Sequence, residues 1–488
     1  MLDVINEFLT GKVLIPLVLG LGGYFTFRSK FVQFRFFVHM FDVLHSSWRG
    51  GSRQVSSFQA LTLSLAGRVG TGNIVGVGIA VSIGGPGAVF WMWMTALMGM
   101  SSSFFECTLG QLYKRSDGNG LFRGGPSWYI QHGLDKRWLG MLAAVLLLLT
   151  FGFAINGLES HAVSHSLKDA FGLPTMWSGL ALSLLLGVVF VGGIKRIAAV
   201  ADLLVPLKVL AYIGVTAYVI VLQIDHVPAT LMTIIKSAFG LDQAFGGLIG
   251  SAIIMGVRRG VFSNEAGLGS APNVASVATI NHPVTQGAVQ ALSVFIDTFV
   301  ICTSTALMIL LSGFYTPGFE GDGIALAQNS LAAVVGEWGR MFISVMLALF
   351  VFTAMLYNYY LGENSLRFMF GEPRKILIFY RVLVLLLVFW GSIEDLSTVL
   401  AFADITMTLL ALVNLTAMAL LFKVCLRILR DYDEQRRAGI KTPVFDSKLF
   451  LDLDIDPAAW PPLTDRSAAV SHSELASASG LSKRPTQA

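Results

Sequence analysis

Long apolar runs separated by short polar segments fill most of this chain, from residue 13 to residue 425. A helix that crosses a bilayer needs roughly 20 predominantly apolar residues. The runs predict an all-α polytopic membrane protein with about eleven membrane-spanning helices. In chain order, the expected spans are residues 13–27, 57–83, 86–113, 138–167, 176–193, 197–222, 242–280, 284–312, 338–362, 376–391 and 397–425.

Two of these runs are interrupted by glycine-rich polar stretches, at residues 67–73 and 259–269. Inside hydrocarbon, backbone amide and carbonyl groups find no water, so a helix is not interrupted there unless something else takes up the freed groups. Paired broken helices in corresponding halves of a chain are the best sequence indication of a secondary transporter's binding site. We therefore expect a substrate and an ion to bind between the two breaks.

The two halves of the chain carry a weak internal repeat, with an offset of about 195–200 residues, as between Trp138 and Trp338. Two five-helix repeats would produce such an offset, and because five is odd, the second repeat is expected to be inverted. The expected division is an N-terminal span and amphipathic cytoplasmic segment at 1–56, a first repeat at 57–222, an inverted repeat at 241–425 and a disordered cytoplasmic tail at 444–488.

Composition agrees with a membrane protein, since 54% of the residues are hydrophobic and only 13% are charged, against about 25% in soluble domains. Basic residues concentrate in alternate loops. The positive-inside rule then predicts a multi-pass protein of the cytoplasmic (inner) membrane of a bacterium, with its N-terminus outside and its C-terminus in the cytoplasm. The loops expected in the cytoplasm carry, among others, Arg28, Arg49, Lys114, Arg137, Lys195, Arg374, Arg381 and Arg427.

Several classes of function find no support in the sequence. The basic residues lie in loops between apolar runs and reflect topology, so membrane lipid is an expected partner and nucleic acid is not. The cysteines at 107, 302 and 425 have neither metal-site spacing nor a disulfide framework. The chain also lacks a nucleophile motif and a cofactor loop, so we expect neither an enzyme, nor a cofactor, nor a transition metal.

The first break offers groups for both an anion and a cation. Backbone amides freed at Thr71 and Gly72 lie at the positive end of a half-helix, where a carboxylate binds favourably. Freed carbonyls, together with the side-chain oxygen of Asn73, suit a small hard cation. Close helix packing through small residues is the alternative explanation, and it applies most to Gly76 and Gly78.

The second break brings a hydroxyl, an amide and a carboxylate to membrane depth, in Ser263, Asn264 and Glu265. An ionisable residue inside the membrane is costly and indicates a functional site by default. The alternative is that Glu265 is the structural partner of a nearby arginine, either Arg68, Arg258 or Arg259.

Long motifs surround the breaks: residues 70–74 (GTGNI), 84–93 (GGPGAVFWMW), 124–126 (GGP), 262–272 (FSNEAGLGSAP) and 295–298 (FIDT). Together they resemble the alanine or glycine:cation symporter family, over residues 13–430. The resemblance implies a leucine-transporter-like 5+5 inverted repeat and uptake of a small-molecule amino acid, driven by sodium or, in some members, by protons.

The resemblance also implies roles for individual residues. The amides of Thr71 and Gly72 would hold the substrate carboxylate, backbone groups of Ser263 and Ala266 would meet its ammonium and side chain, and Asn73 would lie between substrate and ion. The substrate-binding candidates are Thr71, Gly72, Asn73, Phe262, Ser263, Asn264, Glu265, Ala266, Gly267, Glu159 and His161. The candidates for binding sodium, or for replacing it, are Ala66, Val69, Asn73, Thr353 and Lys208.

Some positions depart from the family's pattern. Glu159 and His161 occupy positions where Gln and Asn are usual, and they are candidates for proton carriers, pocket residues or outward-facing residues near a helix end. Ala354 removes a hydroxyl from the cation region. Lys208 lies in the middle of a span, where a buried ammonium can replace a sodium ion; the alternatives are that it reaches the membrane surface or pairs with Asp202.

Three hypotheses follow. The leading one is a secondary active symporter that imports a small neutral amino acid, such as alanine or glycine, with sodium by alternating access. The second is a proton-coupled or ion-independent carrier in which Lys208 replaces sodium. The third, from another class, is an amino-acid sensor or transceptor that signals through its cytoplasmic tail.

Overall fold

The computed structural model describes residues 8–48, 55–118, 120–241, 249–316, 319, 322–371, 374–394 and 397–462. Helices make up nearly all of this part of the chain. One antiparallel pair of short strands, β1 (Arg115–Ser116) and β2 (Phe122–Arg123), joins two of the helices, with Arg115 opposite Arg123. The predicted all-α class is therefore confirmed.

In the first half of the chain, the apolar runs form helices and the first polar break separates two of them. Short segments of other helix types (η) adjoin several of these helices, and the three in this half are π-helical. The elements are η1 (Leu9–Leu14), α2 (Ile15–Arg28), α3 (Val32–Arg35), α4 (Phe37–Trp48), α5 (Ser57–Arg68), η2 (Gly72–Gly76), α6 (Val77–Gly84), α7 (Gly87–Leu112), α8 (Pro126–Leu134), α9 (Arg137–Leu147), η3 (Leu148–Ile155), α10 (Asn156–Phe171), α11 (Thr175–Phe190) and α12 (Gly193–Leu222).

The second half repeats the alternation, with the second break between two helices. Its elements are η4 (Ile224–His226), α13 (Val227–Ala238), α14 (Ile249–Asn264), α15 (Ala271–Ala275), α16 (Pro283–Phe295), η6 (Ile296–Cys302), α17 (Thr303–Leu310), α18 (Gly323–Val335), α19 (Trp338–Phe370), α20 (Arg374–Gly391), α21 (Ser397–Arg437) and η7 (Ser447–Phe450). Here η6 is π-helical, and η4 and η7 are 3-10 helices.

Seven helices in the described residues are long and apolar enough to cross a membrane, and the bent pair formed by α5 with η2–α6 makes an eighth, with a bend of 53°. The three other expected spans coincide with α11, with α14–α15 and with α20. Helix α11 is shorter than a typical span, α14 and α15 are separated by the second break, and α20 begins with two charged residues. The total of eleven spans and the orientation of the termini stay predictions.

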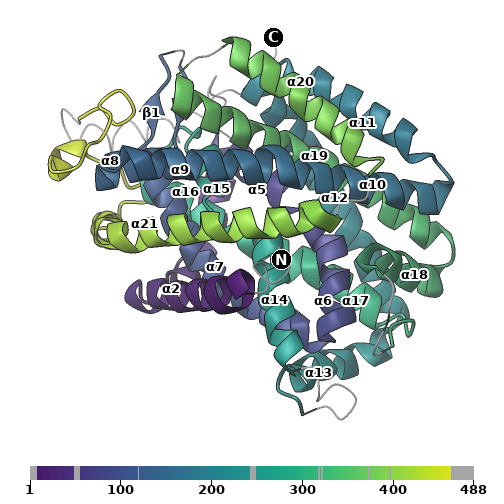
Figure 1. The fold of residues 1–488 in the computed structure, drawn as a ribbon. Helices are drawn as coiled ribbons and strands as arrows, with labels where there is room; N and C mark the ends of the chain where they lie inside the picture. The colour runs from purple at the N-terminus through teal and green to yellow at the C-terminus, as the bar shows by residue number, and fades with distance from the viewer. Residues whose placement is uncertain are drawn as a thin grey trace, which may run out of the picture.

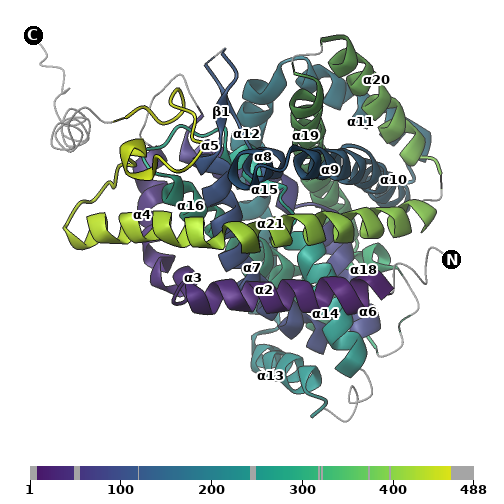
Figure 2. The same cartoon turned by 60° about the vertical axis from the view of Figure 1, so that its left-hand side comes forward.

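The two halves of the chain are interleaved around the breaks. Helix α14, from the second half, packs along α6 and α7, and α5, from the first half, packs against α12 and α19. Helices α2, α9 and α21 run side by side in both views (Figures 1 and 2). The breaks therefore lie inside the helical body, where each contacts helices from the other half.

Helix α4 forms where an amphipathic segment was expected, and it has two unlike faces. Met40 and Val43 are buried, whereas the side chains of Val38 and Phe41 are 73% and 46% exposed. Three further helices, α8, α13 and α18, form in stretches that were expected to be loops. Each is short, so none reaches the length on which the prediction of spans depended.

The C-terminal prediction was wrong for residues 444–462. The Pro-Pro pair, the Ser/Ala-rich stretches and the low apolar content of the tail predicted disorder, but Phe445 and Trp460 are buried against the helical body. The indole nitrogen of Trp460 donates to the Gln111 carbonyl at 3.0 Å, and Asp454 forms an ion pair with Arg115 at 2.8 Å. This segment lies beside β1 and α8 at one end of the helices (Figure 2). Residues 463–488 lie outside the described part of the chain.

Candidate functional site

The first break is closed by its own asparagine. Helix α5 ends at Arg68, and the side-chain oxygen of Asn73 accepts a hydrogen bond from the Gly70 amide at 2.9 Å. The carbonyl of Asn73 in turn accepts from the Thr305 hydroxyl at 2.7 Å. Thr71 and Gly72 begin the next helical segment, and the first amides of a helix have no intrahelical acceptor. Their amides therefore have no acceptor within the helix.

The second break bends because several of its residues are left-handed. Gly267 and Gly269 have φ angles of 84° and 78°, and Glu265, which is not a glycine, has a φ of 52°. Such a conformation costs a non-glycine residue roughly 1–2 kcal/mol. The surrounding contacts must supply that energy, so the shape of this break is imposed by its neighbours.

One of those neighbours is Glu106, in the C-terminal part of α7. Its buried carboxylate accepts from the amides of Gly267 at 3.3 Å and Gly269 at 3.0 Å, and from Asn414 Nδ2 at 3.0 Å. Asn414 also donates to the Gly267 carbonyl at 2.8 Å. The backbone groups that the second break frees are thus taken up by α7 and α21.

The two breaks touch each other. A Cβ atom placed on Gly72 would lie 2.8 Å from Ser263 Cα and 3.3 Å from the Phe262 ring, so only glycine permits this approach. Arg68, which is buried, donates to the Asn264 carbonyl and to the Ser103 hydroxyl. The structure therefore brings the candidates of both breaks into one buried region, as predicted.

Asp297, at the start of η6, connects the same two breaks from the side. Its carboxylate accepts from Asn73 Nδ2 at 2.7 Å, from Ser263 Oγ at 3.1 Å and from Thr298 Oγ1 at 2.9 Å. Asp297 and Glu106 were not among the predicted site residues. One signal in the sequence could have identified them: each is an acidic residue inside an apolar run, which is costly unless it has a role.

Two further carboxylates, those of Glu265 and Glu159, border the breaks. Glu265 accepts from the Ser270 hydroxyl at 2.6 Å and from the Tyr357 hydroxyl at 3.3 Å. Among the described residues no direct ion pair joins Glu265 to an arginine: Arg258, for example, pairs with Asp404 at 2.5 Å. The alternative of an arginine partner for Glu265 stays a prediction.

Glu159 lies against the first break, but His161 does not. Glu159 accepts from Asn358 Nδ2 at 3.0 Å, and its Oε1 is 2.9 Å from where a Cβ on Gly70 would be. Two residues along a helix are about 200° apart, so His161 faces away. Its Nδ1 is 2.8 Å from the Glu394 carbonyl oxygen, and its ring lies 3.8 Å from that of His165. His161 is a site candidate that the structure does not bring to the breaks.

The Lys208 ammonium occupies the position predicted for the cation. It donates to the Val69 carbonyl at 2.9 Å and to Thr353 Oγ1 at 2.5 Å, and Thr353 Oγ1 lies 3.4 Å from the Ala66 carbonyl. Lys208 is fully buried, so it does not reach the surface. Asp202, its other predicted partner, instead accepts from Gln59 and Thr62 at 2.8 and 2.5 Å.

Two buried amide atoms beside the breaks lack hydrogen-bond partners within the described residues: Asn264 Nδ2 and Asn358 Oδ1. Burying such an atom without a partner costs about 1–3 kcal/mol. A small polar molecule held between the breaks would find a donor and an acceptor there. Close packing explains Gly78, because a Cβ on it would collide with Gly323. It does not explain Gly76, because a Cβ there would lie 3.9 Å from Arg259 Cδ, which is an ordinary contact distance.

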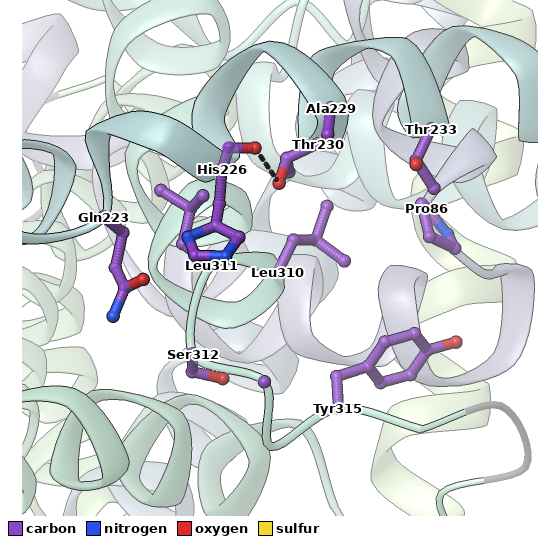
Figure 3. Close-up of a pocket in the computed structure, with 11 residues that line it drawn as sticks. Pro86, Gln223, His226, Ala229, Thr230, Thr233, Leu310, Leu311, Ser312 and Tyr315 are labelled. Carbon is purple, nitrogen blue, oxygen red and sulfur yellow. Dashed lines mark hydrogen bonds between the residues drawn. The ribbon is translucent and has the colours of Figure 1, made fainter.

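A cavity of about 420 Å³ lies elsewhere, between α13 and the end of α17 (Figure 3). Its lining includes Gln223, His226, Thr230 and Tyr315. No predicted site residue lines it. The cavity is therefore distinct from the region between the breaks.

Comparison with known proteins places this geometry in context. The sequence pattern of the sodium:alanine symporter family matches residues 1–447. The chain is 48% identical to the "Probable sodium/glutamine symporter GlnT" of Bacillus subtilis, over 90% of this chain and 91% of that protein. It is 34% identical to the "Sodium/alanine symporter AgcS" of Methanococcus maripaludis, over 90% and 98%. Among solved structures, MhsT in complex with L-phenylalanine aligns with a TM-score of 0.54 at 14% identity, covering 76% of this chain and 89% of MhsT. That alignment establishes a shared leucine-transporter-like fold.

Proposed function

The chain belongs to the sodium:alanine symporter family, and from that premise we propose that it imports a small neutral amino acid together with sodium. It is a multi-pass protein of the bacterial inner membrane whose relatives are transporters. The single observation that carries the proposal is the direct contact between the two broken helices at Gly72 and Ser263.

The substrate's two charges match the two breaks. We expect the carboxylate at the amides of Thr71 and Gly72, where the helix dipole favours an anion. The ammonium would meet acceptors of the second break, including backbone groups of Ser263 and Ala266 and the Glu265 carboxylate. No covalent chemistry is required. Transport would proceed by movement of one helix bundle against the other around this site.

The driving force would be the cation gradient. Each unit charge that moves inward across 100 mV gains about 2.3 kcal/mol, which corresponds to roughly a 50-fold accumulation ratio. In this proposal sodium binds beside the carbonyls of Ala66 and Val69 and the Thr353 hydroxyl. Lys208 must then move, because its ammonium already donates to two of these oxygens, the Val69 carbonyl and the Thr353 hydroxyl.

The test is uptake of labelled amino acids into proteoliposomes that contain the full chain. Alanine, glycine and glutamine are the substrates to compare, because the names of the relatives include alanine and glutamine. A sodium gradient and a proton gradient are imposed separately. Accumulation under sodium alone supports the proposal. If folded protein accumulates none of the three under sodium, the proposal is wrong.

A second candidate function is favoured by the contacts of Lys208. An ammonium hydrogen-bonded to Val69 and Thr353 already supplies a positive charge at the cation position. The protein would then be a proton-coupled or ion-independent carrier. We expect wild-type uptake to be insensitive to sodium in this case, and Lys208→Met to abolish its dependence on pH.

Lys195→Met is the matched control, since Lys195 lies on the same helix and is exposed. Sodium-dependent uptake by the wild type, retained in Lys208→Met, would contradict the second candidate. The third hypothesis, a sensor that signals through its tail, stays a prediction: it requires that deletion of residues 463–488 preserve uptake and abolish a downstream response.

A further inference from the structure

A second cavity, of about 370 Å³, lies between the end of α19 and the beginning of α20. Five residues line it: Arg367, Arg374, Leu377, Ile378 and Arg381. The four residues on α20 are spaced i, i+3, i+4 and i+7, so they share one face of that helix. Arg367 contributes from the last turn of α19. Three guanidinium groups from two helices therefore converge on one pocket.

Two of the three arginines contact polar side chains of α19. Arg367 Nε pairs with the Glu363 carboxylate at 2.9 Å, and Arg381 Nε donates to the Tyr359 hydroxyl at 3.3 Å. Arg374 is exposed and has no ion-pair partner among the described residues. The Glu363 carboxylate pairs with Arg367, and the terminal nitrogens of Arg374 and Arg381 can serve another acceptor.

The chemistry of the ligand follows from the arginines. A guanidinium group binds the oxygens of a phosphate in a bidentate manner, and such charge-assisted hydrogen bonds are about twice as strong as neutral ones. Two or three guanidinium groups around a pocket of this size match a phosphodiester anion. Such an anion could reach the pocket as free phosphate or as part of a phospholipid.

The surroundings favour the phospholipid. The outer face of α20 next to the pocket is apolar and exposed, since Ile378, Phe379, Val382 and Leu386 are 52%, 68%, 51% and 60% accessible. In a membrane protein, such a face contacts acyl chains. Headgroup and chains of one molecule could therefore bind the pocket and the helix face together, which free phosphate cannot do.

We propose that Arg367, Arg374 and Arg381 form a binding site for the headgroup of an anionic phospholipid. The basic loops around residues 367–381 are those that the positive-inside rule assigns to the cytoplasm. Basic pockets between helices on that side of a membrane recognise phosphate headgroups. The site is separate from the breaks, so the proposal does not depend on the transported substrate.

The test is native mass spectrometry of the purified full chain, titrated with phosphatidylglycerol, cardiolipin or phosphatidylethanolamine in detergent. Inorganic phosphate is added as a competitor. We expect phosphatidylglycerol and cardiolipin to bind in preference to zwitterionic phosphatidylethanolamine. Arg374→Gln combined with Arg381→Gln should weaken anionic lipid binding by about tenfold or more, since two charge-assisted contacts are lost.

Two controls make the result specific. Lys375→Gln removes one charge next to the pocket from a residue that does not line it, and it should change binding less than twofold. Arg374→Lys keeps the charge but loses the bidentate geometry, so it should weaken binding while leaving the fold intact. Thermal unfolding of each variant in detergent verifies folding.

Three outcomes would overturn the proposal. The first is equal binding by the wild type and the double variant. The second is an equal loss in Lys375→Gln, because this would indicate general attraction to basic loops. The third is displacement of the lipid by millimolar inorganic phosphate, because this would identify the pocket as a site for a soluble anion.

Discussion

The carboxylate of Glu106 is expected to hold the second break in shape, and Glu106→Gln isolates that role. The substitution preserves the size of the side chain but replaces one acceptor oxygen with an amide that donates. In the wild type, one oxygen accepts from Gly267 and the other accepts from both Gly269 and Asn414. A glutamine can keep an oxygen at only one of these positions.

The less costly orientation leaves the oxygen facing Gly269 and Asn414, so that the amide NH2 faces the Gly267 amide. One buried donor then loses its partner, at about 1–3 kcal/mol, and the two remaining bonds lose the contribution of a charged acceptor, at up to about 1 kcal/mol in total. We expect Glu106→Gln to lose about 1–4 kcal/mol of the free energy of unfolding. Because the strain falls on Gly267, we also expect reduced uptake.

The assay combines thermal unfolding in detergent with uptake into proteoliposomes. A double-mutant cycle with Asn414→Leu separates the terms, because removing that donor should change the cost of Glu106→Gln by a measurable coupling energy of about 0.5–3 kcal/mol. A wild-type melting temperature and wild-type uptake in Glu106→Gln would refute the reasoning. That result would mean that the group in the native protein already carries a proton and donates like an amide.

Three shorter predictions address other parts of the structure. Gly72→Ala should reduce uptake more than tenfold, because its Cβ would lie 2.8 Å from Ser263 Cα, whereas Gly76→Ala should have little effect; equal uptake by the two variants would contradict the predicted contact. Burial lowers the pKa of His39 from its ordinary value to about 4, so the unfolded chain binds a proton between about pH 6.5 and pH 4 that the folded protein does not. Stability should therefore fall as the pH decreases through this range, and thermal unfolding of His39→Gln should be less sensitive to pH than that of the wild type. Trp460→Ala should lose about 3–5 kcal/mol of packing energy and expose the C-terminal segment to limited proteolysis; unchanged proteolysis would show that the segment is not held by this side chain.

Much of the site was predictable because its signals are local in the sequence. A glycine-rich polar stretch inside an apolar run requires partners for freed backbone groups wherever it occurs. That requirement identified the breaks at residues 67–73 and 259–269 from the sequence alone. The ligand set of Ala66, Val69 and Thr353 came from family resemblance. In the structure the Lys208 ammonium donates to Val69 and Thr353, and the Thr353 hydroxyl lies 3.4 Å from the Ala66 carbonyl.

Other features depended on tertiary structure. Helical periodicity predicts that Glu159 and His161 lie on different faces of α10, but only the packing decides which face meets the first break. The partners of Glu106 are 161, 163 and 308 residues away along the chain, and no sequence spacing indicates such a distance.

The C-terminal segment illustrates the same limit. Composition measures whether a segment can bury enough apolar surface by itself. Residues 444–462 instead bury Phe445 and Trp460 against the helices of the rest of the chain. The sequence alone therefore determined the apolar helices, the two breaks and the family. Only the tertiary structure decided which buried charges meet, because that depends on how each helix is rotated and which distant segments pack beside it.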